Sequence, residues 1–255
     1  MFVYKCEDSF ESVFTAIYKV YENHHQREEV FLSLDDDPRL FSTVIEVETD
    51  AERYQKVIRT LRKQFGESDY ERLCLVLASL DVEKAQAVFG TVVAGLNCGC
   101  GAGHLFDNLT DTWVYKAFKL ARNAGRENDR YREFIRFEEL ESGILYSPIK
   151  PENNILLFLM PHFADRLSGE NFVIHDVGRE LFGVHPAGEE WFLVQGEPTA
   201  KEESVHGRAK SLSEEKYQML FKTFCKSIEI KERRNPKLQM GMLPLRYREY
   251  MTEFH

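Results

Sequence analysis

The sequence has no long apolar runs, few glycine and proline residues, and no cysteine pattern typical of a disulfide-stabilised fold. No apolar segment approaches the roughly 20 residues that span a bilayer. The chain has only 15 Gly and 8 Pro in 255 residues, while 43% are hydrophobic and 29% charged, which argues against disorder. Its first residues do not follow the basic-then-apolar order of a signal peptide. The five scattered cysteines predict reduced thiols, so we expect a cytoplasmic protein.

The first half of the chain is predicted to be mainly helical. Residues 1–7 alternate like a short strand, and Ser9 is placed to cap the helix that follows. The polar stretch 24–38 is expected to be a loop. Helical spacing then dominates and ends in a long helix over residues 111 to about 133.

After residue 133 the pattern changes to an alternation of apolar and polar residues with a period of two, as in strands. Residues 134–140 and 143–149 predict two strands, and residues 171–176 and 179–185 predict a hairpin around a two-residue turn at Val177-Gly178. We expect a helix over 155–167, capped by Asn154 and kinked at Pro161, a strand over 190–195, and a last helix from Ser213 to about 228.

Helices and strands do not alternate regularly along this chain. We therefore predict an α+β fold in which helical blocks flank a small, mainly antiparallel sheet. The N-terminal strand can join that same sheet. For this reason we expect one entangled unit over residues 1–255, with sub-regions 1–133, 134–197 and 198–255.

The C-terminal segment is basic although the chain as a whole carries a net charge of −9. Between Lys216 and Arg248, nine positive residues face only Glu229 and Glu232. Clustered cations suit a polyanion, because phosphate neutralisation dominates nucleic-acid affinity. The predicted DNA contacts are phosphates for Arg233, Arg234 and Arg246, base edges for Asn235 and Gln239, and stacking for Tyr247. Alternatively, the apolar residues of the segment pack down and the arginines stay solvated.

A second set of arginines lies on the predicted long helix. Arg122, Arg126 and Arg130 recur every four residues and share one stripe, and Arg136 follows on the next element. Guanidinium groups suit phosphate oxygens, so these four are further candidate DNA contacts. The acidic residues among them favour the alternative of a salt-bridged face.

Two His-Asp groupings are candidate catalytic residues. His162 and Asp165 would share a helix face, where the carboxylate could orient the imidazole as a base. His175 and Asp176 lie at the hairpin, where Asp176 would pair with Arg179 across the turn. A structural role is favoured for both groupings. The alternative is an enzyme that acts on damaged nucleotides through a pocket made by these four residues.

The stretch Cys98-Gly-Cys100 with His104 resembles an incomplete metal site. Zinc normally needs four ligands, and no second matching pair exists in the sequence. The glycines also lack the lysine and hydroxyl of a P-loop. We therefore expect no metal and no cofactor, and glycines that let helices approach closely.

Several segments together resemble a bacterial family of DNA metabolism and DNA repair proteins. The resemblance covers nearly the whole chain, from Tyr4 and Ser9-Phe-Glu11 to the basic segment. The matching residues are Arg136-Phe137, Leu145-Tyr-Ser-Pro148, Pro161-His-Phe-Ala-Asp-Arg166, Ile174-His-Asp176, Glu232-Arg-Arg-Asn-Pro-Lys-Leu-Gln239, Pro244 and Arg246-Tyr247.

Members of that family are typically encoded beside a radical-SAM DNA modification or repair protein, and the module is also found fused to uracil-DNA-glycosylase-like domains. The resemblance implies an accessory role in DNA repair or modification, with DNA and one of these proteins as partners. It supplies no catalytic residues. A protein-interaction adaptor without DNA contact is the remaining alternative.

Overall fold

The computed structural model describes residues 1–35, 40–196, 210–228 and 230–254. Backbone contacts concentrate in two compact units. Unit 1 comprises Met1–Arg126 and Glu152–Asn154, and unit 2 comprises Glu127–Pro151 and Ile155–His255. This division shows where contacts gather, and the expectation that the chain behaves as one entangled unit stays a prediction.

Unit 1 contains a three-stranded parallel sheet. The central strand β1 (Phe2–Lys5) lies between β2 (Val30–Ser33) and β3 (Thr43–Glu46). Parallel neighbours need a long crossover, which α1 (Phe10–Glu22) and η1 (Arg27–Glu29) provide between β1 and β2. The predicted N-terminal strand is confirmed. The prediction that it joins the later sheet is wrong, because β1 pairs only with β2 and β3 among the described strands.

The expectation of a loop over residues 24–38 is also wrong for part of that range. All four residues of β2 are buried, and Leu32 is fully enclosed. A strand that is buried on both faces shows no polar-apolar alternation, so the sequence offers no period by which to recognise it. β3 is mostly exposed and shows none either.

Helices cover this sheet and supply the rest of the core of unit 1. They are α2 (Ala51–Ala78), which is interrupted at Gly66, α3 (Lys84–Cys98) and the first part of α4 (Thr112–Phe134). Gly66 has φ 82°, a conformation that favours glycine, and an added Cβ there would meet the Ala102 side chain at 3.1 Å. The core includes Phe14, Phe65 and Phe89.

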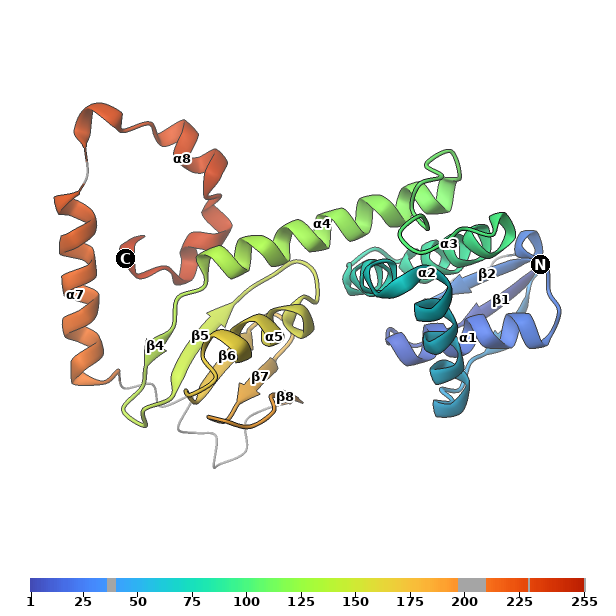
Figure 1. Ribbon diagram of the computed structural model, residues 1–255, viewed down its shortest axis with the longest axis horizontal. Helices are drawn as coiled ribbons and strands as arrows, with labels where there is room; N and C mark the ends of the chain where they lie inside the picture. The colour runs from blue at the N-terminus through green and yellow to red at the C-terminus, as the bar shows by residue number, and fades with distance from the viewer. Residues whose placement is uncertain (36–39, 197–209, 229, 255) are drawn as a thin grey trace. The chain divides into compact units, whose positions relative to one another are not determined.

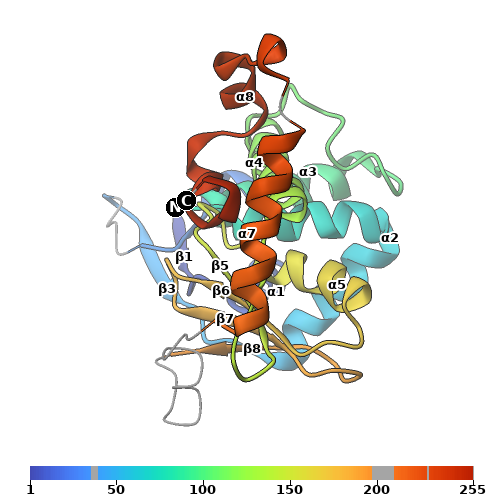
Figure 2. The ribbon, with the colours of Figure 1, turned by 90° about the vertical axis from the view of Figure 1, so that its left-hand side faces the viewer.

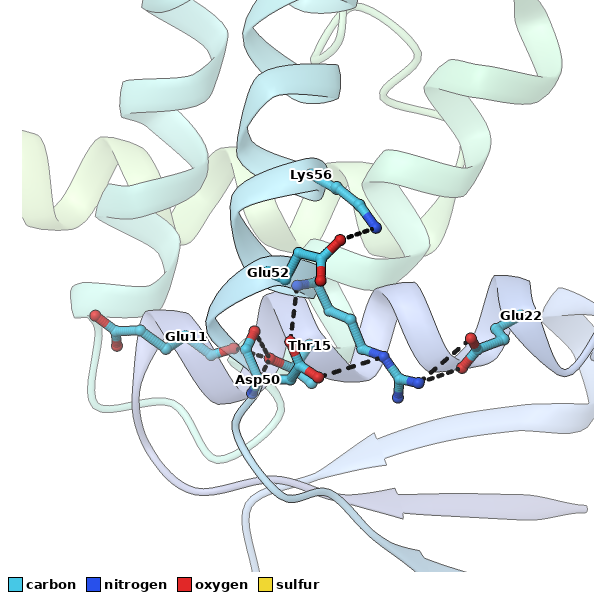
Figure 3. Close-up of polar contacts among 7 residues, drawn as sticks. Glu11, Thr15, Glu22, Asp50, Glu52 and Lys56 are labelled. Carbon is cyan, nitrogen blue, oxygen red and sulfur yellow. Dashed lines mark hydrogen bonds and ion pairs between the residues drawn. The ribbon is translucent and has the colours of Figure 1, made fainter.

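A polar cluster holds the start of α2 against α1 (Figure 3). The buried Thr15 hydroxyl donates to the Glu11 carbonyl at 2.7 Å and accepts from the Asp50 backbone N–H at 3.2 Å. The Asp50 carboxylate caps α2 by accepting from the Arg53 N–H at 3.0 Å. Arg53 also reaches Glu22 on α1, with Nη2 3.2 Å from Oε2. These contacts fix the direction in which α2 leaves the sheet.

Unit 2 contains a five-stranded sheet in the order β4-β5-β6-β7-β8 (Figure 1). The strands are β4 (Glu138–Glu139), β5 (Leu145–Ile149), β6 (Phe172–Asp176), β7 (Leu181–His185) and β8 (Phe192–Gln195). Only β5 and β6 pair in parallel, and α5 (Leu156–Arg166) connects them. The predicted α+β class and the mainly antiparallel sheet are confirmed. Ile155, not Asn154, is the N-cap of α5.

The two faces of the second sheet have separate apolar clusters. On one face Phe172 and Ile174 pack with α5 residues such as Leu159. On the other face Val173 packs with Tyr146 and with Phe182. Successive residues of β6 thus point to opposite faces, as strand geometry requires.

The C-terminal segment runs along unit 2 as a series of short elements. They are α7 (Leu212–Ser227), η2 (Lys231–Arg233), α8 (Pro236–Met242), η3 (Leu245–Tyr250) and η4 (Thr252–Phe254). A backbone bridge between Leu140 and Lys210 joins the start of α7 to the β4 edge of the sheet, and Figures 1 and 2 both show α7 at that edge. The N-cap is Ser211, two residues before the predicted start.

The cysteines differ from expectation at one place. Cys98 and Cys100 form a disulfide across Gly99, whereas Cys6, Cys74 and Cys225 are free. The prediction of reduced thiols is therefore wrong for the first two. In the described parts of the chain, no cluster of three or more His, Cys, Asp or Glu could hold a metal ion. No described helix combines the length and apolar character that crossing a membrane requires.

Candidate nucleic-acid interface

The predicted arginine stripe on α4 divides between the two units. Arg122 and Arg126 belong to unit 1 and are exposed. Neither guanidinium has an ion-pair or hydrogen-bond partner among the residues that the structure describes. These two side chains are therefore accessible to an anion, and their contact with phosphate stays a prediction.

In unit 2 the remaining arginines of this group are engaged within the protein. Arg130 Nη1 lies 3.3 Å from Glu133 Oε2 and donates to the Met242 carbonyl at 3.1 Å. Arg136 Nη2 lies 3.0 Å from Glu253 Oε1. These are the salt bridges of the alternative interpretation. A phosphate would have to compete with both carboxylates, so Arg130 and Arg136 are weak candidates.

Tyr247 does not fit the predicted stacking role. Its side chain is buried, and its ring contacts Tyr131 edge-on, with the ring centroids 5.1 Å apart. Arg246 Nη2 donates to the Tyr247 hydroxyl at 2.8 Å, and its guanidinium lies 4.8 Å from the centre of the same ring. Burial raises the pKa of Tyr247, and the nearby Arg246 charge opposes that shift. A ring that is enclosed in the core offers no face to a base, so we discard this part of the prediction.

The amides of the basic segment have different surroundings. The Asn235 carboxamide oxygen accepts from the Leu238 N–H at 3.1 Å and so caps α8. This oxygen is therefore engaged within the fold. Gln239 is exposed on α8. Of the two amides, only Gln239 presents its side chain to solvent without a capping role.

Four cations that precede the end of α8 have solvent-exposed side chains. We call them the outer cations: they are exposed and, among the described residues, have no ion-pair or hydrogen-bond partner for their side chains. They are Lys216, Lys226, Arg233 and Lys237. Arg234 is exposed beside Arg233. The outer cations thus carry positive charge that no described residue compensates.

The first His-Asp grouping lies on α5. His162 is half-buried and meets the Phe163 ring edge-on at 5.0 Å. Burial lowers the pKa of His162, and the positive charges of Arg132 and Arg166 lower it further. Asp165 is exposed, and no hydrogen bond between these two described side chains orients the imidazole.

His175 belongs to the core of the sheet. The Tyr146 hydroxyl lies 2.7 Å from His175 Nδ1, and Glu180 Oε2 lies 3.3 Å from Nε2. The imidazole stacks on Phe182 with centroids 4.0 Å apart. These contacts are typical of a buried histidine that is satisfied within the fold.

Asp176 points to the opposite face and pairs with Arg179, with Oδ2 2.8 Å from Nη1. Burial raises the pKa of this carboxyl, while the Arg179 hydrogen bond and charge oppose the shift. The predicted pair is confirmed, but its predicted geometry is wrong. Asp176 opposes Leu181 in the ladder, so the turn has four residues and Arg179 lies within it. Adjacent strand residues cannot converge on one pocket, and the four-residue catalytic site is not assembled.

One cavity in the described structure is lined by predicted DNA contacts, and it is very small. It lies against Arg136, Arg246 and Tyr247 and has a volume of about 10 Å³. That is space for one water molecule and not for an extruded base. A base-flipping pocket at this position is therefore excluded in this conformation.

Unit 1 contains a cleft that the sequence did not suggest. It has a volume of about 390 Å³ and is lined in part by Arg27, Gln86, Asp111 and Trp113. Arg27 Nη1 lies 2.7 Å from Asp111 Oδ2. Burial would raise the pKa of Asp111, but the Arg27 bond and backbone N–H groups outweigh it and lower the pKa. These residues come from three separated segments, so no local motif could have revealed the cleft.

The comparison with protein families gives a match over residues 83–253 to the family described as a domain of unknown function, DUF4130. The chain belongs to this family. The matched range begins at α3 and includes α4 and nearly all of unit 2, so both sets of exposed arginines fall within it. Neither a curated protein nor a solved structure matches the DUF4130 chain.

Proposed function

We propose that this DUF4130 protein is an accessory module of DNA repair or modification that binds DNA locally through its exposed cations. The observation that carries the proposal is the state of the outer cations, which are exposed and have no ion-pair partner among the described residues, in a chain of net charge −9. This positive charge is local, in contrast to the acidic chain as a whole. It suits a polyanion that is held at one place.

The magnitude of the effect follows from counterion release. Each neutralised phosphate of duplex DNA contributes about −0.9 to the slope of log affinity against log salt. Four outer cations therefore predict a slope of roughly −3 to −4 at most. Arg122 and Arg126 form a separate pair in unit 1, and their contribution is to be measured separately.

The test is a KCl titration of DNA affinity by fluorescence anisotropy, with a labelled 20-base-pair duplex and the corresponding single strand. Arg233→Ala and Lys237→Ala should each reduce the slope by about 1 and weaken binding to all sequences alike. Arg59→Ala removes an exposed arginine of α2 outside the proposed contacts and is the matched control. An unchanged slope in the double variant Arg233→Ala/Lys237→Ala overturns the role of the outer cations.

The finer part of the proposal is the protein partner. The resemblance of the Glu232–Gln239 segment and the other motifs to DNA repair proteins supports a radical-SAM or uracil-DNA-glycosylase-like partner. Co-purification of the chain with each candidate, with and without nuclease, tests this. An association that nuclease abolishes is bridged by DNA, and one that survives nuclease is direct.

A further inference from the structure

The end of α1 places an imidazole beside a buried tyrosine of unit 1. His24 has φ 54°, a backbone conformation that favours glycine, and the His25 N–H donates to the Val20 carbonyl at 3.2 Å. The chain therefore reverses sharply after the helix, and the His25 ring stacks on Phe2 with the ring centroids 3.8 Å apart. The Tyr4 hydroxyl lies 2.9 Å from His25 Nδ1. These contacts fix the position of the imidazole.

Hydrogen bonding also determines which nitrogen of His25 carries the proton. Asn23 Nδ2 donates to the Tyr4 hydroxyl at 2.8 Å, and Tyr4 is fully buried. Because this hydroxyl oxygen accepts from Asn23, its own proton is donated to His25 Nδ1. The neutral imidazole then carries its proton on Nε2. Nε2 has no partner among the described residues, so it is a donor that the fold leaves unused.

His25 lines another cleft of unit 1, which has a volume of about 280 Å³ and which we call the His25 cleft. Its apolar wall comes from Val20 on α1 and from Phe89 and Val93 on α3, and the half-exposed Tyr21 adds an aromatic ring. The volume is close to the lower end of the roughly 300–1,000 Å³ that is typical of small-molecule sites. The His25 cleft therefore suits a small ligand with an apolar face, such as a flat ring system.

Uncommitted polar side chains lie around the same cleft. Gln26, Glu28 and Asn97 line it, are exposed, and have no hydrogen-bond or ion-pair partner for their side chains in the described parts of the chain. Together with His25 Nε2 they offer both donors and acceptors. Amides bind the edge of a heterocycle that carries a donor beside an acceptor, and a carboxylate accepts from an exocyclic amino group. These are the groups by which proteins recognise the edges of bases.

The charge of the His25 cleft disfavours an anionic ligand. Arg27 is the one arginine or lysine among the described residues that line it, and both of its Nη atoms bond to Asp111, at 2.7 and 2.8 Å. The Glu28 carboxylate has no such compensation. A phosphate would therefore meet a negative charge here instead of an unpaired cation. A neutral ligand that donates from an amino group fits this charge distribution.

We propose that the His25 cleft binds an amino-bearing heterocycle of the nucleobase class, either as a free nucleoside or as an unpaired base of a DNA strand. The ring lies against the apolar wall, Glu28 accepts from the amino group, and His25 Nε2 donates to an acceptor of the ring. This inference goes beyond the proposed function, because it concerns a different site. Nucleosides carry no phosphate, so their binding does not depend on the outer cations.

The experiment is isothermal titration calorimetry of the full chain with two matched pairs of nucleosides. Cytidine and uridine, like adenosine and inosine, differ by an amino group in place of an oxo group. In each pair the amino nucleoside should bind about fivefold or more tightly. Glu28→Gln should reduce this preference to about twofold or less, because an amide also donates to an oxo group. Glu29→Gln is the matched control, since Glu29 is exposed and unpaired among the described residues but does not line the cleft.

Two further variants test the other contacts. Asn97→Ala changes an exposed side chain and should weaken binding of adenosine by about threefold or more, as expected for one lost hydrogen bond. His25→Gln should weaken binding of both amino nucleosides by a similar factor. Nitrogen-15 NMR of the natural chain should show His25 protonated at Nε2 in the neutral state. Protonation at Nδ1 instead would contradict the assigned donor.

A deoxythymidine oligonucleotide with or without one central deoxycytidine identifies the source of the base. If only the strand with deoxycytidine displaces cytidine, and Glu28→Gln abolishes this difference, the ligand is a base of DNA. If neither strand displaces cytidine, the ligand is a free nucleoside. Both results support the site.

Four results overturn the proposal: no binding of any nucleoside or strand, equal binding within each pair, a preference that Glu28→Gln leaves unchanged, and tighter binding of cytidine monophosphate than of cytidine. The affinity for cytidine should be the same in Arg233→Ala/Lys237→Ala. The salt slope for duplex DNA should be the same in Glu28→Gln. The two proposals therefore fail separately.

Discussion

Two consecutive parts of the basic C-terminal segment look alike in sequence and differ in structure. In the outer part, residues 212–228 and 230–242, the outer cations and the large side chains of Tyr217, Leu220 and Phe224 are exposed. The inner part, residues 243–254, buries Tyr247 and Met251. It also uses Arg248, which donates to the Leu243 carbonyl at 3.0 Å and lies over the Phe254 ring. Arginine and aromatic content alone therefore does not distinguish a binding surface from a packing element.

The difference arises from the partners that each part meets. Tyr247 reaches an aromatic cluster with Tyr131 and Phe134 in unit 2. On α7, Tyr217, Leu220 and Phe224 stay more than half exposed, and Gln218 and Glu214 hydrogen-bond to the β4 edge. The inner part thus packs into the fold, whereas the side chains of the outer part stay largely exposed.

The largest expected effect comes from removing the buried side chain of Tyr247 in the inner part. Tyr247→Ala should lower the free energy of unfolding by about 3–5 kcal/mol, because it removes a buried aromatic side chain. Urea denaturation checks this. Tyr217→Ala, at an exposed aromatic of the outer part, should change it by only about 0.5 kcal/mol. Similar losses for the two variants would contradict the comparison.

A smaller effect is expected from the ion pair that ties η4 to Arg136. Arg136→Gln should cost about 1 kcal/mol, since both side chains are partly shielded from water. Glu253→Gln should cost a similar amount, and the double variant should lose little more. Glu133→Gln, in the more exposed pair with Arg130, should cost about 0.3 kcal/mol. Strict additivity of the first two changes would show that the pair does not couple.

The smallest effect is a pH dependence carried by the inner part. Burial raises the pKa of Tyr247 above its usual value near 10. Its stability contribution is therefore complete below pH 10 and is lost as the pH rises through the folded-state pKa. Unfolding free energy measured between pH 9 and 11 should fall less steeply in Tyr247→Phe than in the natural chain. Parallel curves would exclude this contribution.

Much of the helical structure could be predicted from the sequence. Ser9 caps α1 as its residue type predicts, and α4 has nearly the predicted bounds. β2 and β3 could not be predicted, because neither alternates. The pairing of β1 with them depends on long-range contacts, which local periodicity does not contain.

The candidate site was less predictable than the fold. Charge in the sequence selects candidate arginines, but only the structure shows their surroundings: Arg136 pairs with Glu253, whereas Arg233 is exposed. A helical pattern such as that of α7 normally predicts an inward apolar face. In the structure, the polar side chains Glu214 and Gln218 hold α7 against β4 instead.

Residues Glu152–Asn154 belong to unit 1, although they follow the first segment of unit 2 in the sequence. The Asn154 N–H donates to the Ala78 carbonyl at 2.8 Å, at the C-terminal end of α2. The ribosome synthesises Asn154 only after Glu127–Pro151, which belong to unit 2. Unit 1 therefore cannot complete its native contacts during translation before the second unit has begun to emerge.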